Sequence, residues 1–181
     1  MASSSQRGAA TSRATPPPDQ LAAFYKLVDK QLIAGVLCRH ARVAELSASA
    51  AVQAEALFGG DDSLVVASLR LDESESLSSL ALRASGAERE TFTRRSWAAL
   101  VSLIPLLRRR VEANTLLPGT VREEELGYEA HMQAAGMKAQ NKPVPPPAVL
   151  RSWVSTMGYN AILSALHRSL DYLPHPLWRA V

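Results

Sequence analysis

Hydrophobic residues recur at helical spacing along most of the chain, and no segment alternates convincingly as a strand would. A first stripe runs from residue 21 to residue 36, and a second from residue 43 to residue 57. Their members are Leu21, Phe24, Val28, Leu32 and Val36, then Val43, Leu46, Ala50, Ala54 and Leu57. Residues three and four apart share one face of an α-helix, so each stripe predicts an amphipathic helix.

Capping and turn residues indicate where these helices begin and end. Asp19 stands where an N-cap residue is expected, and Gly59–Gly60 would end the second stripe. Residues 64–85 predict a long helix, although its polar centre, DESES, is a poor helix former. Gly86 separates this helix from another one predicted over residues 87–117.

The second half of the chain continues the helical pattern. Thr120 and Glu123 have the spacing of a capping box, in which each side chain bonds the other residue's backbone N–H. Residues 141–147 (NKPVPPP) are typical of a stiff, extended connection. A last helix is predicted over residues 148–173. The chain therefore reads as five or six helices joined by short turns.

Composition agrees with one all-α domain. The length of 181 residues suits a single domain, and aromatic residues make up only 6%. A core built mostly from Leu, Val and Ala favours helix over strand. We expect a disordered tail over residues 1–18, one helical domain over residues 19–173 and a Pro-rich tail over residues 174–181.

One part of the chain resembles a tetratricopeptide repeat of the kinesin-light-chain type. The resemblance rests on residues 54–63 (AEALFGGDDS), 66–67 (VA), 77–81 (LSSLA) and Gly86. It covers a minority of the chain, and Val66 lies about two helical turns further from the LSSLA segment than in the family, which keeps the same face inward. The resemblance implies antiparallel helical hairpins that stack into a protein-binding surface. An irregular helical bundle is the alternative arrangement.

A second resemblance covers more of the chain but implies no activity. Residues 43–158 are similar to a protein family of single-celled algae. The shared segments are ALFGGDDSLVVA, LLPGTVREEELGYEAH and PVPPPAVLR.

Residues 94–110 (RRSWAALVSLIPLLRRR) place arginines on both sides of an apolar run. The run is far shorter than the roughly 20 apolar residues of a membrane span, so no membrane span is expected. Trp97, Leu100, Ile104 and Leu107 share one face of a helix, which predicts a core helix edged by arginine stems. The alternative is a polyanion or nucleic-acid site made of Arg94, Arg95, Arg108, Arg109 and Arg110. The net charge of +3 does not by itself favour nucleic acid.

Catalytic and metal-binding patterns are sparse. Glu124, Tyr128 and His131 could share one helix face, which gives a small helical enzyme as a third hypothesis against an ordinary surface role. The single cysteine excludes a disulfide within the chain and a Cys-rich zinc site. No two histidines have ligand spacing and no phosphate-binding loop occurs, so we expect no catalytic residue, metal, cofactor or small-molecule substrate.

The sequence therefore predicts a noncatalytic protein–protein interaction or scaffold module of the helical-repeat type, with another protein as its partner. A cytoplasmic location is expected, and targeting to an organelle by the Ser/Ala/Arg-rich N-terminus is the alternative. The residues assigned to the core are Leu64, Leu77, Leu80, Trp97, Leu100 and Leu107.

Overall fold

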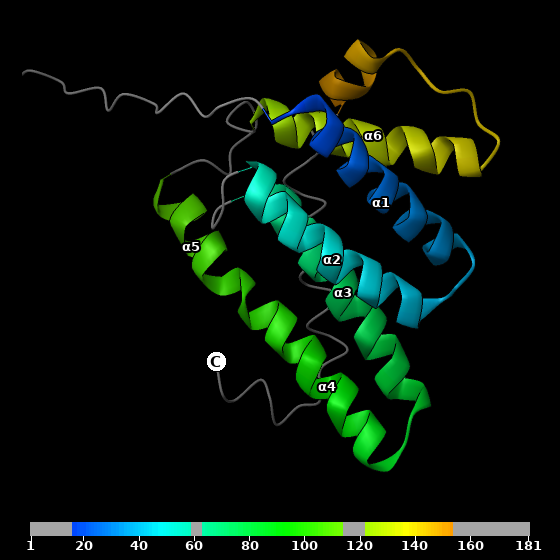
Figure 1. Cartoon of the computed structure of the whole chain (residues 1–181), viewed down its shortest axis with the longest axis vertical. Helices are drawn as coiled ribbons and strands as arrows, with labels where there is room; N and C mark the ends of the chain where they lie inside the picture. The colour runs from blue at the N-terminus through cyan, green and yellow to red at the C-terminus, as the bar shows by residue number, and fades with distance from the viewer. Residues whose placement is uncertain (1–15, 59–62, 114–121, 154–181) are drawn as a thin grey trace, which may run out of the picture.

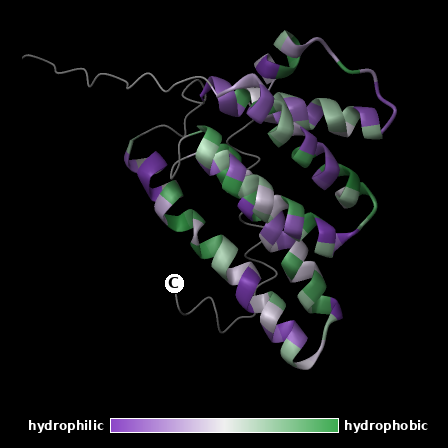
Figure 2. Cartoon of the chain, in the orientation of Figure 1, coloured by the Kyte–Doolittle hydropathy of each residue, from purple (hydrophilic) through white to green (hydrophobic). Residues whose placement is uncertain are grey.

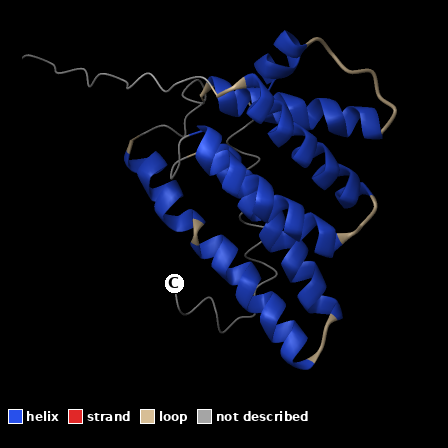
Figure 3. Cartoon of the chain, viewed as in Figure 1, coloured by secondary structure: helices blue, strands red, loops and turns tan. Residues whose placement is uncertain are grey.

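The structure is a computed structural model that describes residues 16–58, 63–113 and 122–153. Its helices are α1 (Pro18–Val36), α2 (His40–Phe58), α3 (Leu64–Arg83), α4 (Gly86–Val101), α5 (Leu103–Glu112) and α6 (Glu123–Ala139). A further helical segment begins at residue 147 and is described as far as residue 153. No strand occurs in these ranges (Figure 3), which confirms the all-α class.

The first four helices pack side by side in chain order (Figure 1). The helix α2 packs against both α1 and α3, and α3 packs against both α2 and α4. The helix α5 continues the course of α4 along one edge of the molecule, and α6 lies beside α1. The central position of α3 explains why so many of its side chains are buried on more than one face.

The core contains the apolar residues that the stripes predict, with aromatic rings at its centre. The Phe24 ring lies 5.4 Å from the Phe58 ring and 6.1 Å from the Tyr128 ring, so it joins α1, α2 and α6. Three of the six assigned core residues are buried, namely Leu64, Leu77 and Leu100. Leu80 and Trp97 are partly buried. The side chain of Leu107 lies outside the described part of the chain.

The predicted helix over residues 87–117 is divided at Ser102 into α4 and α5. Pro105 has no N–H group to donate to the carbonyl of Val101, which accounts for a break at this point. Residues 114–117 lie outside the described residues. The inward face also differs from the prediction, because Leu103 and Leu106 are buried whereas Ile104 is exposed. Assigning Ile104 to the buried face was therefore wrong.

Buried serines explain this change of face and the helical conformation of the polar run in α3. The Ser96 hydroxyl lies 2.9 Å from the hydroxyl of Ser74 and 2.8 Å from that of Ser78, and it also donates to the Ser74 carbonyl at 3.0 Å. A buried hydroxyl needs such partners, so this contact fixes which side of α4 faces α3. The Ser74 and Ser78 hydroxyls of α3 thus hold α3 against α4.

A buried ion pair joins α5 to α6. Arg110 Nη2 donates to Glu125 Oε2 at 3.0 Å, and both side chains are only 2% exposed. The same carboxylate accepts the backbone N–H of Arg122 at 2.9 Å and, through Oε1, that of Leu64 at 3.0 Å. Glu125 therefore caps the N-terminal ends of two helices, α6 and α3, while it neutralises Arg110.

This arrangement corrects two predicted helix starts. The helix α6 begins at Glu123, and the Glu125 carboxylate rather than Glu123 accepts the N-cap backbone N–H, that of Arg122; Thr120 lies outside the described residues. The helix α1 begins at Pro18, with Asp19 in its first turn instead of at the N-cap. Proline suits the first helical position because its missing N–H would have no partner there.

Replacing Arg110 by methionine leaves the Glu125 charge buried without its guanidinium. We expect Arg110→Met to lower the free energy of unfolding by about 3–5 kcal/mol, measured by urea denaturation. Arg108→Met is the control, because Arg108 is exposed on the same helix and should change stability by less than about 0.5 kcal/mol. Equal, small effects of both substitutions would contradict a structural role for the pair.

Candidate functional site

The five arginines proposed to bind an anion do not form one exposed face. Arg94, Arg95, Arg108 and Arg109 are exposed, whereas Arg110 is buried in its pair with Glu125. Including Arg110 in an exposed anion site was therefore wrong, because its charge is already neutralised inside the protein. Arg94 is also paired, through Nη2 to Glu90 Oε1 at 2.6 Å.

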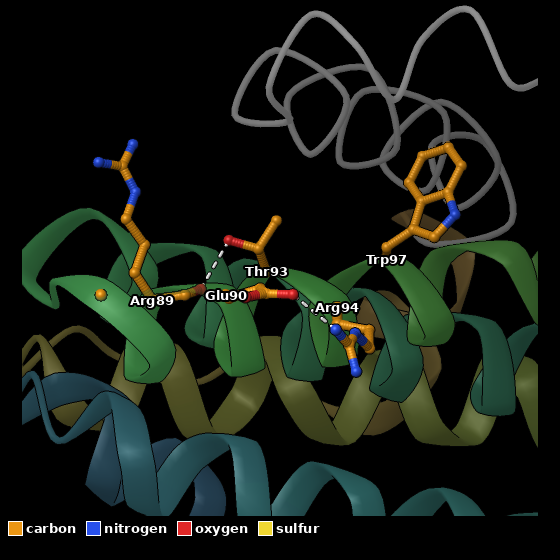
Figure 4. A pocket seen from close by; sticks show the side chains of 6 residues that line it. Arg89, Glu90, Thr93, Arg94 and Trp97 are labelled. Atoms are coloured by element: carbon orange, nitrogen blue, oxygen red, sulfur yellow. Dashed lines mark hydrogen bonds and ion pairs between the residues drawn. The ribbon is translucent and has the colours of Figure 1, made fainter.

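The exposed side of α4 carries a shallow hollow of about 430 Å³ that includes Arg94 (Figure 4). Figure 4 shows Arg89 and Trp97 projecting to the same side of α4, while Arg94 turns along the helix toward Glu90. The Thr93 hydroxyl is occupied, because it donates to the Arg89 carbonyl at 2.8 Å. This face mixes both signs of charge, so it offers no concentrated positive potential for a polyanion.

Two residues of the predicted catalytic group, Tyr128 and His131, contact α1 in the structure. The Tyr128 ring is buried against Phe24, and His131 Nε2 lies 2.7 Å from Asp29 Oδ1. The Tyr25 ring stacks on the His131 ring at 4.5 Å. In the described residues no hydrogen bond links Glu124, Tyr128 and His131 to one another. Tyr128 and His131 instead form the joint between α1 and α6.

Beyond this joint the two helices diverge toward their C-terminal ends and leave a groove between them (Figure 1), here called the α1–α6 groove. Its volume is about 600 Å³. One wall is formed by the end of α1, with Leu32, Ile33, Val36 and Leu37. The other wall is formed by the second half of α6, with Ala134, Ala135, Gly136 and Ala139.

The walls of the α1–α6 groove do not fill the space between them. The α6 side carries only small apolar residues and Lys138, so it cannot cover the larger side chains opposite. Ile33 is 60%, Val36 65% and Leu37 53% exposed. Hydrophobic colouring reaches the end of α1 and its turn in Figure 2. Adjacent exposed aliphatic side chains of this kind mark an interaction site more often than isolated ones do.

A second cavity lies on another flank of α1 and is here called the acidic crevice. Its volume is about 380 Å³, and its lining includes Gln31, Asp72, Glu75, Ser79, His40 and Met132. Gln31 Nε2 donates to Asp72 Oδ2 at 2.7 Å, which connects α1 to the middle of α3. Leu32 and Val36 line both cavities, so the α1–α6 groove and the acidic crevice share one ridge of α1.

Burial is the main cause of raised pKa values in and near the acidic crevice. Burial raises the pKa of Asp72 to about 7, the hydrogen bond from Gln31 opposes this, and the charges of Glu75 and Glu129 add to it. Burial also raises the pKa of Glu129, against the hydrogen bond from Ser68. Burial and the charge of Asp72 raise the pKa of Tyr128 well above its usual range. Asp72 therefore titrates near neutral pH.

No family model, curated protein or solved structure matches the chain. Across the described ranges, no group of three or more His, Cys, Asp and Glu side chains could hold a metal ion. No helix in those ranges is long and apolar enough to cross a membrane. The candidate sites are therefore the two cavities beside α1.

The apolar stripes in the sequence indicated some of the residues that line these cavities. The α1 stripe was extended to Val36 and the α6 stripe to Ala139, yet the structure leaves both residues exposed. Ile33 and Leu37 were not predicted, although they widen the apolar face of α1 beyond what one neighbouring helix can cover. Asp72 lies within a run that looks like a solvated helix surface, and nothing local indicates its burial.

Asp72→Asn should stabilise the protein at neutral pH. The folded protein keeps the Asp72 proton up to about pH 7, while the unfolded chain releases it near pH 4, so stability falls as pH rises through this window. Asparagine keeps an acceptor for Gln31 and removes the buried charge. We expect a gain of about 1–3 kcal/mol at pH 8 and almost none at pH 4, measured by urea unfolding.

Glu90→Gln is the control for this substitution, since Glu90 is exposed on α4 and should alter stability by less than about 0.5 kcal/mol at either pH. Glu129 keeps its raised pKa in the Asp72→Asn variant, so the pH dependence should shrink rather than disappear. An equal effect of Asp72→Asn at both pH values would contradict the burial of the Asp72 charge.

Proposed function

We propose that this chain is a noncatalytic protein–protein interaction module that receives an amphipathic helix of a partner protein in the α1–α6 groove. The observation that carries the proposal is the cluster of exposed aliphatic side chains on α1 opposite a wall of small residues on α6. A third helix seated there would bury both walls, in the way that helix-binding proteins present a groove to an apolar helix face.

The dimensions of the α1–α6 groove suit a helical segment. Its α1 wall extends from Asp29 to Leu37, which corresponds to about 12 Å, or a little over two turns of helix. A partner helix would thus present two or three apolar anchors at i, i+3 or i+4, and i+7. Each anchor that becomes fully buried contributes about 1.5–3 kcal/mol, against the entropy lost on association.

The ends of the α1–α6 groove would set the orientation of the partner helix. The closed end holds the paired Asp29 and His131, and Lys138 is exposed near the open end. The C-terminal end of a helix attracts cations and its N-terminal end attracts anions. A partner helix with its C-terminal end toward Lys138 would be attracted there, so we favour this direction.

Two further considerations support an interaction module over the alternatives. The helical hairpins α1–α2 and α3–α4 are of the kind that the tetratricopeptide resemblance implies, although the resemblance itself stays a prediction. Arg110, Arg94 and His131 are paired with Glu125, Glu90 and Asp29, respectively. These pairs favour neither a polyanion site nor a catalytic one. The single cysteine suits a reducing compartment such as the cytoplasm.

Selection from a displayed library of helix-forming peptides tests the proposed groove. Peptides bound by the wild-type protein should carry apolar residues at helical spacing, and Ile33→Asp should weaken their binding by about tenfold or more, as measured by fluorescence anisotropy. The reason is that an aspartate in the apolar wall must be desolvated when the peptide docks.

Leu82→Asp provides the matched control. Leu82 is 64% exposed on α3 and does not line the groove, so its replacement changes surface hydrophobicity equally without touching the proposed site. Peptide binding should be unchanged in this variant. Selected peptides that bind both variants and the wild type equally, or a library that yields no specific binder, would overturn the proposal.

A further inference from the structure

The acidic crevice is lined by several hydrogen-bond acceptors, the Asp72 carboxylate among them. Asp72 and Glu75 lie three residues apart on α3, so their carboxylates project from the same face of that helix. The Ser79 hydroxyl donates its hydrogen bond to the Glu75 carbonyl at 3.0 Å. Its oxygen can therefore act only as an acceptor toward a ligand. Among the described lining residues, no lysine or arginine supplies a compensating positive charge, and His40 is the one residue that can carry one.

Gln31 provides independent evidence that a donor is missing. Its side chain is 4% exposed and lines the acidic crevice. The amide nitrogen is satisfied by Asp72, but the amide oxygen, Oε1, has no hydrogen-bond partner among the described residues. A buried amide oxygen without a partner is uncommon in folded proteins, because it has lost its water without replacement. A bound group with N–H donors would satisfy it.

We propose that the acidic crevice between α1 and α3 binds an organic cation, namely an ammonium or guanidinium group. Such a group carries several N–H donors and a positive charge, which match the Asp72 carboxylate and the acceptors around it. The Met132 and Leu32 side chains supply apolar contact for the aliphatic part of the ligand. Two sources offer this chemistry, a free polyamine and the lysine or arginine side chain of another protein.

Binding of a cation would change the ionisation of Asp72. A cation beside Asp72 favours the charged carboxylate, so binding should release a proton near neutral pH and strengthen as the pH rises. The groups that face Asp72 are Glu75 on its own helix, Glu129 and Tyr128 on α6, and Gln31 on α1. His40, at the start of α2, lines the same crevice.

Titration of the whole chain with two probes tests the site. Spermidine represents a free polyamine, and N-acetylarginine amide represents a protein side chain. Amide NMR spectra recorded at about pH 8 should show saturable shifts at Gln31 and Asp72, with affinities in the high-micromolar to millimolar range. Tighter binding of one probe identifies the source, and comparable binding of both supports the shared chemistry.

Asp72→Asn should weaken binding of either probe by about tenfold, since it removes the charge but keeps an acceptor for Gln31. This variant is expected to be more stable than the wild type, so loss of binding would not reflect unfolding. Glu90→Gln removes an exposed carboxylate from α4 and should bind both probes normally. Absence of saturable shifts at about 10 mM probe, or equal shifts in Asp72→Asn, would overturn the proposal.

The result of the cation-binding test can be distinguished from the result of the peptide-binding test of the α1–α6 groove. Ile33→Asp leaves the lining of the acidic crevice intact, so it should not weaken the binding of either probe. Loss of peptide binding in Ile33→Asp and loss of cation binding in Asp72→Asn are therefore independent results. A competent crevice with an inactive groove would refute the proposed function while it supports the cation site.

Discussion

The arrangement of the helices depends on one buried carboxylate. Glu125 accepts hydrogen bonds from Arg110 on α5, from the backbone at the start of α6 and from the first residue of α3. The Leu64 donor lies 61 residues before Glu125 in the chain. A charge in the interior is tolerated only when its partners are in place, so this contact couples the ends of three helices. A movement of any one of these helix ends would break its hydrogen bond to Glu125 and disturb the contacts of the other two.

The joint between α1 and α6 illustrates the opposite situation, because only its first half is closed. Aromatic rings and the Asp29–His131 pair hold the helices together near their N-terminal halves. Beyond His131 the α6 residues that line the groove are Ala and Gly, apart from Lys138. The α1–α6 groove therefore follows from the distribution of large and small residues along two helices, and the apolar side chains at the end of α1 stay exposed.

The helices were largely predictable from the sequence, whereas the polar interior was not. Spacing rules identify α1 and α2 because their buried positions recur every three to four residues, whereas α3 is buried on more than one face. The same rules placed Ile104 inward, since they cannot register that Ser96 must face Ser74 and Ser78. Arg110 looked like part of a basic surface for a related reason. Its partner Glu125 lies on another helix, and a contact of that kind leaves no trace in local periodicity.

Glu125 and Asp72 differ in how their charges are compensated inside the protein. Glu125 is buried and Asp72 is partly buried, and Glu125 is matched by a guanidinium and two backbone N–H groups. Asp72 has a neutral amide as its hydrogen-bond partner, with further acids nearby. A protein selected for stability alone would fill this position with a neutral residue. Retention of an acid there is understandable if the missing positive charge comes from outside the chain.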